Sequence, residues 1–391
     1  MATRKVLRVE DVKINNRNKI LAMIYRTGKN GISQSVVANE TGLKGASVFR
    51  IFTELEKDGL IQLIDEAPEI TVLKGRKPSL FTVNPNALYV VAAEITCTGI
   101  DLSFFNFMTD TLASASYEFT HEDIDDITNM IIKFTEDNIV ALNLPREKVV
   151  GISVSLPGVV DINSGIILKY ERIKGCVDYP MADKLKNALG LNTIICNSTA
   201  TNAYYEYNTN KYGSSVFTIL LRHGINGAFI NKGKIFLDSN GYSLDFEHLQ
   251  VSFEGGPKCS CGSEGCLQSY IFNIEDEYNE KILLDLEKYL STDLARLDFI
   301  LDKIVYYLAV LIRGFDKIMN PSSFLILTKD KKIGEILRNK LKKVMDEKVS
   351  TYSKDLQKPF YSSTYDTVNC QKASVVVLLK QFFDPETAIY S

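Results

Sequence analysis

The sequence predicts an α/β protein of two or three domains, in which a small helical domain precedes a larger, strand-rich body. The chain has 391 residues, more than one hydrophobic core usually serves. Apolar residues recur at helical spacing up to about residue 60, whereas β-rich runs begin near residue 88. The charge divides at the same place, with 14 lysines and arginines against 9 acidic residues in 1–85 and 31 against 39 afterwards. A basic domain ahead of an acidic body suggests that the first part meets a polyanion.

The composition is typical of globular proteins. Hydrophobic residues make up 45% of the chain and charged residues 24%, with a formal net charge of -3. These values exclude disordered and membrane-spanning classes of protein. The first 20 residues lack the apolar core of a signal peptide, and no run of about 18 uncharged apolar residues follows. With 7 cysteines, an odd number, we expect reduced thiols and a cytoplasmic location.

The first predicted helix covers residues 16–28, where Ile20, Leu21, Ile24 and Tyr25 recur at helical spacing before a glycine. Such a helix has one apolar face and needs a partner to cover it. The segments that follow are expected to supply that partner.

A pair of shorter helices joined by a tight turn comes next. Ser33 is a suitable N-cap for the first of them, and Thr41–Leu43 supplies the turn with its glycine. The second runs from about residue 44 to residue 58, and its inward residues are expected to be Val48, Phe49, Phe52 and Leu55. This arrangement is typical of a helix-turn-helix DNA-binding module.

Two short strands are predicted after these helices, at 60–64 and 79–84, with a basic loop between them. They convert the module into a winged helix-turn-helix. In such a domain the second helix of the pair enters the major groove, and the wing reaches the DNA backbone or the minor groove. The alternative is a protein-interaction module whose basic loop is only solvated. The expected DNA contacts are Lys44, Ser47 and Arg50 on the helix and Lys74, Arg76 and Lys77 on the wing.

The body begins with three strand-rich runs from residue 88, broken near 97–99 and 108–110. A helix at 124–140 and a buried strand at 149–161 follow. A second series of the same kind starts near residue 192, so we expect two α/β lobes of similar plan.

The domain boundaries follow from this pattern. The apolar helices predicted within 297–327 are suited both to a core and to a dimer face. We expect a DNA-binding domain at 1–85, a first lobe at 86–193 completed by 375–391, and a second lobe at 194–374.

Three of the cysteines lie within eight residues, at Cys259, Cys261 and Cys266, and His248 lies eleven residues before the first of them. Three thiolates and one imidazole complete a tetrahedral structural zinc site. A disulfide between Cys259 and Cys261 would close a strained ring and leave Cys266 unpaired, so a redox pair is the weaker alternative. Four ligands leave no position for a catalytic water, so we expect a structural metal on a loop turned by Gly255, Gly256, Gly262 and Gly265.

The chain resembles the ROK family (repressor, open reading frame, kinase) over nearly its full length. The resemblance rests on the winged N-terminal domain, on "GISVSLPGVVD" and "GINGAFINKGKI", and most specifically on "EHLQVSFEGGPKCSCGSEGCLQSY". It implies a two-lobed sugar-kinase body of the actin-like ATPase, or ribonuclease H-like, fold. It also strengthens the zinc interpretation, and it implies a sugar pocket that the zinc loop helps to frame.

Kinases of this family open the body with an Asp-x-Gly-Gly-Thr phosphate loop, and they use the aspartate of an Asn-Asp pair as general base. The matching positions here read Glu94, Ile95 and Thr96, and Asn197 followed by Ser198. These departures predict that the chain is not an enzyme. A second phosphate loop survives only in part, through Gly224, Gly227 and Gly233.

The resemblance also implies the residues that contact the sugar. Only Asn197 and His248 keep the residue types of the family. Arg172 stands at the place of an asparagine, and its guanidinium suggests an acidic or phosphorylated sugar unless it points to solvent. The six matching positions are Arg172, Asn197, Ser198, Asp245, His248 and Gln268.

Together these interpretations predict a sugar-responsive transcriptional regulator, most simply a repressor of carbohydrate-utilisation genes. It would bind double-stranded operator DNA as a homodimer or a dimer of dimers, and a carbohydrate or carbohydrate derivative between its lobes. No membrane partner is expected. One alternative is a sugar kinase whose motifs have drifted. Another is a DNA-binding scaffold controlled by a partner protein.

Overall fold

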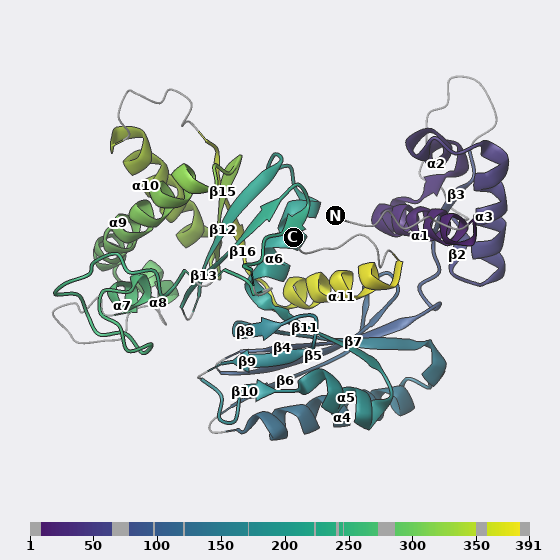
Figure 1. Ribbon diagram of the computed structural model, residues 1–391, viewed down its shortest axis with the longest axis horizontal. Helices are drawn as coiled ribbons and strands as arrows, with labels where there is room; N and C mark the ends of the chain where they lie inside the picture. The colour runs from purple at the N-terminus through teal and green to yellow at the C-terminus, as the bar shows by residue number, and fades with distance from the viewer. Residues whose placement is uncertain are drawn as a thin grey trace.

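The fold combines a small N-terminal domain with two α/β lobes, and a C-terminal helix lies at their junction (Figure 1). The predicted fold class is confirmed, because three N-terminal helices and a small sheet precede two larger mixed sheets. This computed structural model describes residues 9–64, 78–96, 98–119, 122–170, 172–222, 224–239, 242–244, 246–272, 286–348 and 358–383.

The N-terminal domain is a winged helix-turn-helix. Ser33 caps the second helix by accepting a hydrogen bond from the Val36 amide at 3.3 Å, and Gly42 ends that helix at a φ of 70°. The first helix begins at Val9, well before the predicted residue 16. The prediction missed these early turns because polar residues dominate them. The elements are α1 (Val9–Thr27), the short η1 (Gly28–Asn30), α2 (Gln34–Thr41), α3 (Gly45–Lys57), and strands β1 (Ile32–Ser33), β2 (Ile61–Leu63) and β3 (Leu80–Val83) in the order β1-β3-β2.

The buried face of α3 differs from the prediction at one residue. Phe49 was expected inward, but its side chain is 61% exposed. The buried residues follow the i, i+3, i+4, i+7 repeat of a helix, and Phe49 lies one step of about 100° away from that stripe. The residues that α3 buries are Val48, Ile51, Phe52 and Leu55.

The first lobe is built on a five-stranded sheet with the order β11-β7-β4-β5-β6. Strands β11, β7 and β4 are parallel, and β4, β5 and β6 form the predicted meander. The strand predicted at 149–161 is in fact two strands, because Pro157 cannot donate to a ladder and the chain turns there. The sheet contains β4 (Tyr89–Ile95), β5 (Gly99–Asn106), β6 (Thr111–Glu118), β7 (Val149–Leu156) and β11 (Asn192–Asn197).

Helices cover both faces of this sheet. The predicted helix at 124–140 is confirmed as α4, and α4 and α5 lie on the face away from the other lobe (Figure 1). A three-stranded sheet with the order β10-β9-β8 flanks the lobe. The remaining elements are α4 (Ile124–Ala141), η2 (Arg146–Lys148), β8 (Val159–Asp161), β9 (Ile166–Lys169), β10 (Val177–Tyr179) and α5 (Met181–Leu189).

The second lobe repeats the plan of the first. Its sheet has the order β14-β13-β12-β15-β16, again a meander of three strands followed by two parallel strands. The segment 323–327, predicted within a helical region, belongs to β15, an interior strand next to the central β12, because its run of apolar residues is buried on both faces. The strands are β12 (Ser215–Leu221), β13 (Ile225–Asn231), β14 (Lys234–Ile235), β15 (Ser323–Thr328) and β16 (Phe360–Thr364).

Four helices pack on the outer side of the second sheet, and two helices fill the space between the sheets (Figure 1). The expected boundary between the lobes at 193/194 falls inside β11, which belongs to the first sheet. The C-terminal helix that covers this sheet, α11, begins at residue 367, whereas the C-terminal part of the first lobe was expected from residue 375. The outer helices are α7 (Leu267–Phe272), α8 (Leu286–Thr292), α9 (Leu294–Ile318) and α10 (Lys331–Lys348), and the inner ones are α6 (Ser198–Thr209) and α11 (Thr367–Phe383).

The N-terminal domain packs against the body through three aromatic rings. The ring centroid of Tyr25 in α1 lies 5.6 Å from that of Phe107, which follows β5, and 5.8 Å from that of Phe383 at the end of α11. Phe107 and Phe383 are themselves 5.6 Å apart. One hydrophobic core therefore continues from the N-terminal domain through α11 to both sheets. Among the described residues, no helix is long and apolar enough to cross a membrane.

Candidate functional site

A cavity of about 450 Å³ lies between the two lobes. The ends of β4, β7 and β11 form its wall on the first lobe, where parallel strands bring their carboxyl ends to one edge. The second lobe contributes the end of β12 and the loop before α7. Of the six predicted sugar contacts, Arg172, Asn197, Ser198, His248 and Gln268 line this cavity, whereas Asp245 lies outside the described residues.

Asn197 and Ser198 stand at the start of α6. The Asn197 Oδ1 accepts a hydrogen bond from the Ala200 amide at 3.0 Å, and its Nδ2 donates to the Gly158 carbonyl at 3.1 Å. Asn197 is therefore the N-cap of α6 and ties it to the turn after β7. Ser198 is 3% exposed, and among the described residues no side chain forms a hydrogen bond with its hydroxyl.

The four predicted metal ligands converge. Their ligand atoms all lie within 4.8 Å of one another, with Cys259 Sγ 3.4 Å from His248 Nδ1 and Cys261 Sγ 3.6 Å from Cys266 Sγ. A tetrahedron with Zn–S bonds of about 2.3 Å separates two sulfurs by about 3.8 Å, so the donor set fits zinc. His248 would bind through Nδ1, and its Nε2 faces Glu247 Oε1 at 3.8 Å.

The local hydrogen bonds favour thiolates at two of the cysteines. Burial raises the pKa of Cys259, but the Cys261 amide and the Gln268 side chain outweigh it and hold that pKa below its usual range. The Ser263 amide lowers the pKa of Cys261. Burial raises the pKa of Cys266 to about 12, and zinc coordinates this residue only as the thiolate, so zinc binding would release its proton.

The zinc loop needs glycine where the chain turns sharply. Gly262 and Gly265 adopt φ values of 92° and 74°, which favour glycine. A Cβ on Gly265 would lie 2.0 Å from the Ser252 carbonyl oxygen. Positions 262 and 265 therefore require glycine for reasons of backbone geometry, in addition to the need for metal ligands in the same loop.

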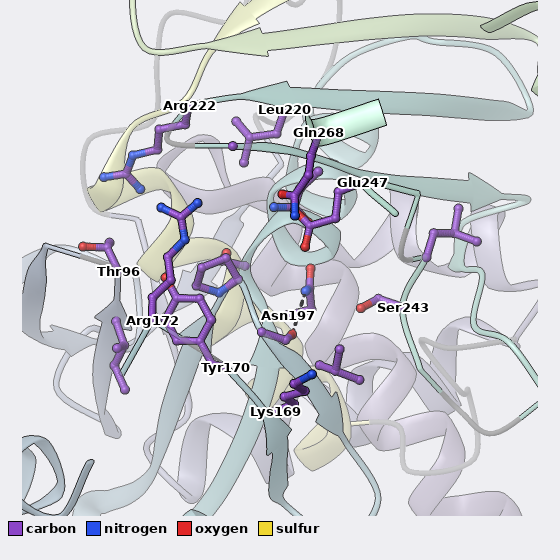
Figure 2. Close-up of a pocket in the computed structure, with 18 of the residues that line it drawn as sticks. Thr96, Lys169, Tyr170, Arg172, Asn197, Leu220, Arg222, Ser243, Glu247 and Gln268 are labelled. Atoms are coloured by element: carbon purple, nitrogen blue, oxygen red, sulfur yellow. Dashed lines mark hydrogen bonds between the residues drawn. The ribbon is translucent and has the colours of Figure 1, made fainter. Parts of the chain in front are cut away.

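Two polar side chains, Gln268 and Glu247, line this wall of the cavity. Gln268 donates its Nε2 to Ser260 Oγ at 3.3 Å and to Cys259 Sγ at 3.6 Å, so its amide faces the zinc loop. Glu247, which was not predicted, points into the cavity toward Asn197 (Figure 2). Its position directly before the metal-binding histidine is the sequence signal that could have identified it.

The opposite end of the cavity holds a contact between the Glu94 carboxyl group and the Arg222 guanidinium, which joins the lobes. Glu94, at the end of β4, is 1% exposed, and its Oε1 lies 3.4 Å from Arg222 Nη1 at the end of β12. The Arg222 guanidinium also lies over the Tyr365 ring at 4.4 Å. The Glu94 Oε2 is buried with no hydrogen-bond partner among the described residues. Burial raises the pKa of Glu94 to about 8, although Arg222 opposes the shift.

Arg172 reaches the same end of the cavity. Its guanidinium points toward that of Arg222, beside the Tyr170 ring (Figure 2). Arg172 therefore lines the cavity, although the residue remains exposed to solvent.

Comparison with known proteins places these residues in a family. The ROK family pattern matches residues 90–360. The chain belongs to the ROK family. A candidate xylose repressor of Caldicellulosiruptor is 22% identical over 356 residues, 85% of this chain and 88% of that protein. A glucokinase of Halalkalibacterium halodurans is 24% identical over 240 residues, 55% of this chain and 72% of that enzyme.

A solved structure shows the same fold throughout. A ROK family transcriptional regulator, described as a homologue of the Escherichia coli MLC protein, matches 95% of this chain and 96% of its own with a TM-score of 0.74 at 20% identity. The ROK family thus includes both regulators and kinases similar to this chain. The residues of the site must distinguish the two.

The glycines of the second ROK phosphate loop have other uses in this chain. A Cβ on Gly227 would lie 1.9 Å from the Phe246 ring, so this glycine makes room for core packing. Gly233 adopts a φ of 75° in the turn between β13 and β14. Gly224 alone of the three lines the cavity.

Of the predicted DNA-binding residues of this ROK protein, the structure describes the three at the second helix of the pair. Lys44 and Arg50 are exposed at α3, and Ser47 is half-buried. Arg50 lies 3.7 Å from Glu54, an exposed pair that a phosphate could replace at little cost. The wing residues Lys74, Arg76 and Lys77 lie outside the described residues.

Proposed function

We propose that this chain is a sugar-responsive transcriptional regulator that works in the cytoplasm and does not transfer phosphate. Residues 1–85 would bind operator DNA, and a carbohydrate or carbohydrate derivative would bind between the lobes. The observation that carries the proposal is α11. It starts beside Tyr365, which lines the cavity, and it ends at Phe383, which packs on Tyr25 of the N-terminal domain.

This helix gives a ligand in the cavity a physical route to the DNA-binding domain. Its first turns pack beside the Glu94–Arg222 pair, and a ligand that changes the distance between the lobes would move α11 against α1. A coupling of about 1–3 kcal/mol is typical of such regulators, and it lowers DNA affinity about 5- to 150-fold.

Two features argue against phosphoryl transfer. Ser198 at the position of the base has no carboxylate or imidazole bonded to it among the described residues, so its hydroxyl cannot accept a proton from a sugar. Glu94 and Arg222 occupy the phosphate end, and Ile95 and Thr96 stand where the kinases of the family carry the glycines that let backbone amides approach nucleotide phosphates. The similarity to glucokinases is therefore assigned to shared ancestry of the sugar pocket.

Dimer formation is part of the proposal, because paired N-terminal domains would match two operator half-sites. The outward face of α9 exposes Phe299, Tyr306 and Val310 at 51%, 59% and 46%. These residues recur at helical spacing along one stripe of the helix, which a second copy could cover.

The proposal is tested with duplexes selected from a random DNA pool by the wild-type chain. We expect sequence-specific binding by two chains per duplex, measured by mobility shift and light scattering, and release on addition of one sugar from a panel. The panel contains xylose, glucose and N-acetylglucosamine, with their phosphates and acids. Binding that no sugar alters would favour control by a partner protein. Any ATP-dependent phosphorylation of a panel sugar would contradict the proposal and favour the drifted kinase.

Replacing Lys44 and Arg50 together by alanine should weaken binding to the selected duplex at least tenfold. The salt dependence of log K should also fall by about two, because two phosphate contacts are lost. Lys331→Ala/Lys332→Ala on α10 removes the same charge from an exposed surface of the body and serves as the control. Equal losses in the two double variants would mean that general charge, and not this helix, binds the DNA.

Arg172→Ala should selectively weaken binding of sugar phosphates and sugar acids. A guanidinium that pairs with an anion contributes about 1.5–3 kcal/mol, so we expect a loss of 10-fold or more for charged sugars and little change for neutral ones. Thermal-shift titration measures both. Lys174→Ala is the control, since Lys174 lies on the same loop and its side chain is 82% exposed. Equal shifts for wild type and Arg172→Ala would exclude a charged ligand at this residue.

A further inference from the structure

Phe49 is a large apolar side chain that the core of the N-terminal domain does not bury. It lies on α3, and its side chain is 61% exposed, whereas Phe52, three residues later, is 1% exposed and packs on Phe81 with the ring centroids 5.1 Å apart. Helix α3 lies at the outer edge of the domain, away from both lobes (Figure 1). Folding therefore leaves the Phe49 ring available to a second molecule.

The residues next to Phe49 on the surface of α3 are small. Side chains on a helix point back toward its N-terminus, so the ring lies over the turn that contains Gly45 and Ala46, and both of these residues are exposed. A Cβ added at Gly45 would meet open space. Thr53, one turn later, donates its hydroxyl to the Phe49 carbonyl at 3.0 Å. The surface in front of the ring is therefore open enough for close approach by a partner.

The charge along α3 indicates which end of the helix can face DNA. The first half, up to Arg50, contains Lys44 and no acidic residue, whereas the second half contains Glu54 and Glu56. The N-terminus of a helix also carries the positive end of its dipole. Helices of this kind place their N-terminal residues against the edges of the bases. Phe49 thus lies in the half of α3 that the charge favours for the major groove.

The chemistry of the ring selects one base. A phenyl ring forms no conventional hydrogen bond with a base edge, and the methyl group of thymine is the apolar group that a base pair presents in the major groove. Contact between ring and methyl removes apolar surface of both from water. We infer that Phe49 reads a thymine in each operator half-site through its methyl group. This inference rests on the proposed function, since it requires that α3 enter the major groove.

The inference is tested with the duplex selected by the wild type, in which each thymine of one half-site is replaced in turn by deoxyuridine. Deoxyuridine keeps the base pair and lacks only the methyl group. We expect one of these replacements to weaken wild-type binding about fourfold, the effect of burying one carbon group. Phe49→Ala should bind the unmodified duplex about 10-fold more weakly, and the same replacement should then change its affinity by less than about 1.5-fold, because the two changes remove one contact.

Control variants separate recognition of the methyl group from other effects. Phe49→Leu keeps an apolar side chain and should remain sensitive to the same replacement. Ile14→Ala removes a side chain that is 57% exposed on α1 and should leave DNA affinity unchanged. Neither substitution of Phe49 removes a charge, so the salt dependence of log K should equal that of the wild type. This result would distinguish Phe49 from Lys44 and Arg50, whose loss lowers the salt dependence.

The outcomes separate this inference from the proposed function. If the wild type binds its duplex specifically and Phe49→Ala responds to every deoxyuridine replacement as the wild type does, the role of Phe49 is refuted and the regulator proposal stands. The same conclusion follows if no replacement affects the wild type. If the wild type binds no duplex specifically, the proposed function itself fails and this inference fails with it.

Discussion

Removing zinc should loosen the sugar pocket and lower the stability of the second lobe. We expect one zinc ion per chain, and stripping it with a chelator should reduce sugar affinity at least tenfold. The physical reason is that the four ligands tie the loop to the wall that carries Glu247 and Gln268, and the other restraints on this glycine-rich loop are mainly backbone hydrogen bonds, such as those from Val251 to Gly265 and from Cys259 to Ser263. Zinc present at about 1,000 times its Kd contributes about 4 kcal/mol to folding by mass action.

The measurement combines elemental analysis, thermal melts with and without chelator, and sugar titration of Cys266→Ser. This variant should bind zinc weakly and melt at a lower temperature. Cys176→Ala is the control, because Cys176 is a buried thiol of the first lobe outside the cluster. A chain that keeps its melting temperature and its sugar affinity after zinc is stripped would show that the four residues do not form a structural metal site.

Glu94→Gln should stabilise the protein at alkaline pH and remove part of its pH dependence. Burial raises the pKa of Glu94 from its ordinary value of 4.5 to about 8. Between these values the unfolded chain has released the proton and the folded chain retains it, so the free energy of unfolding falls as pH rises through this window. A shift of this size corresponds to about 5 kcal/mol at most, and glutamine, which does not titrate, avoids that loss.

Chemical denaturation at pH 5.5, 7 and 8.5 measures this effect as the difference between variant and wild type. The difference should grow with pH and level off above about pH 8. Glu136→Gln is the control, because the Arg146 guanidinium lowers the pKa of this exposed carboxyl and it stays ionised throughout the range. A difference that is constant with pH would mean that Glu94 is ionised in the folded protein at neutral pH. The ion pair with Arg222 would then exist at all of these pH values.

Local patterns in the sequence predicted the elements that depend on neighbouring residues. Ser33 and the glycine at 42 defined α2, and the spacing of Cys259, Cys261 and Cys266 defined the zinc ligands, because caps, turns and chelating loops are short-range features. Phe49 shows the limit of that approach. One residue of error in the helical stripe placed it in the core, although its side chain is largely exposed.

Features that depend on residues far apart in the sequence could not be predicted from local patterns either. The segment 323–327 was predicted as helical, because a continuous apolar run does not distinguish a helix from a strand buried on both faces. Glu94 and Arg222 are 128 positions apart, and no local pattern around either residue shows that they meet. Their ion pair exists because β4 and β12 are the equivalent first strands of the two lobes and end at the same cavity.

The sequence by itself determined the winged helix-turn-helix, the repeated α/β plan, the family resemblance and the four converging metal ligands. The tertiary structure decided which polar residues line the cavity and which hydrogen bonds they form within the protein. It directed Asn197 to the cap of α6 and Gln268 to the zinc loop, and it brought Glu247 into the cavity. The reason is that a side chain's hydrogen bonds are set by neighbours in space, and those neighbours come from segments that the sequence keeps far apart.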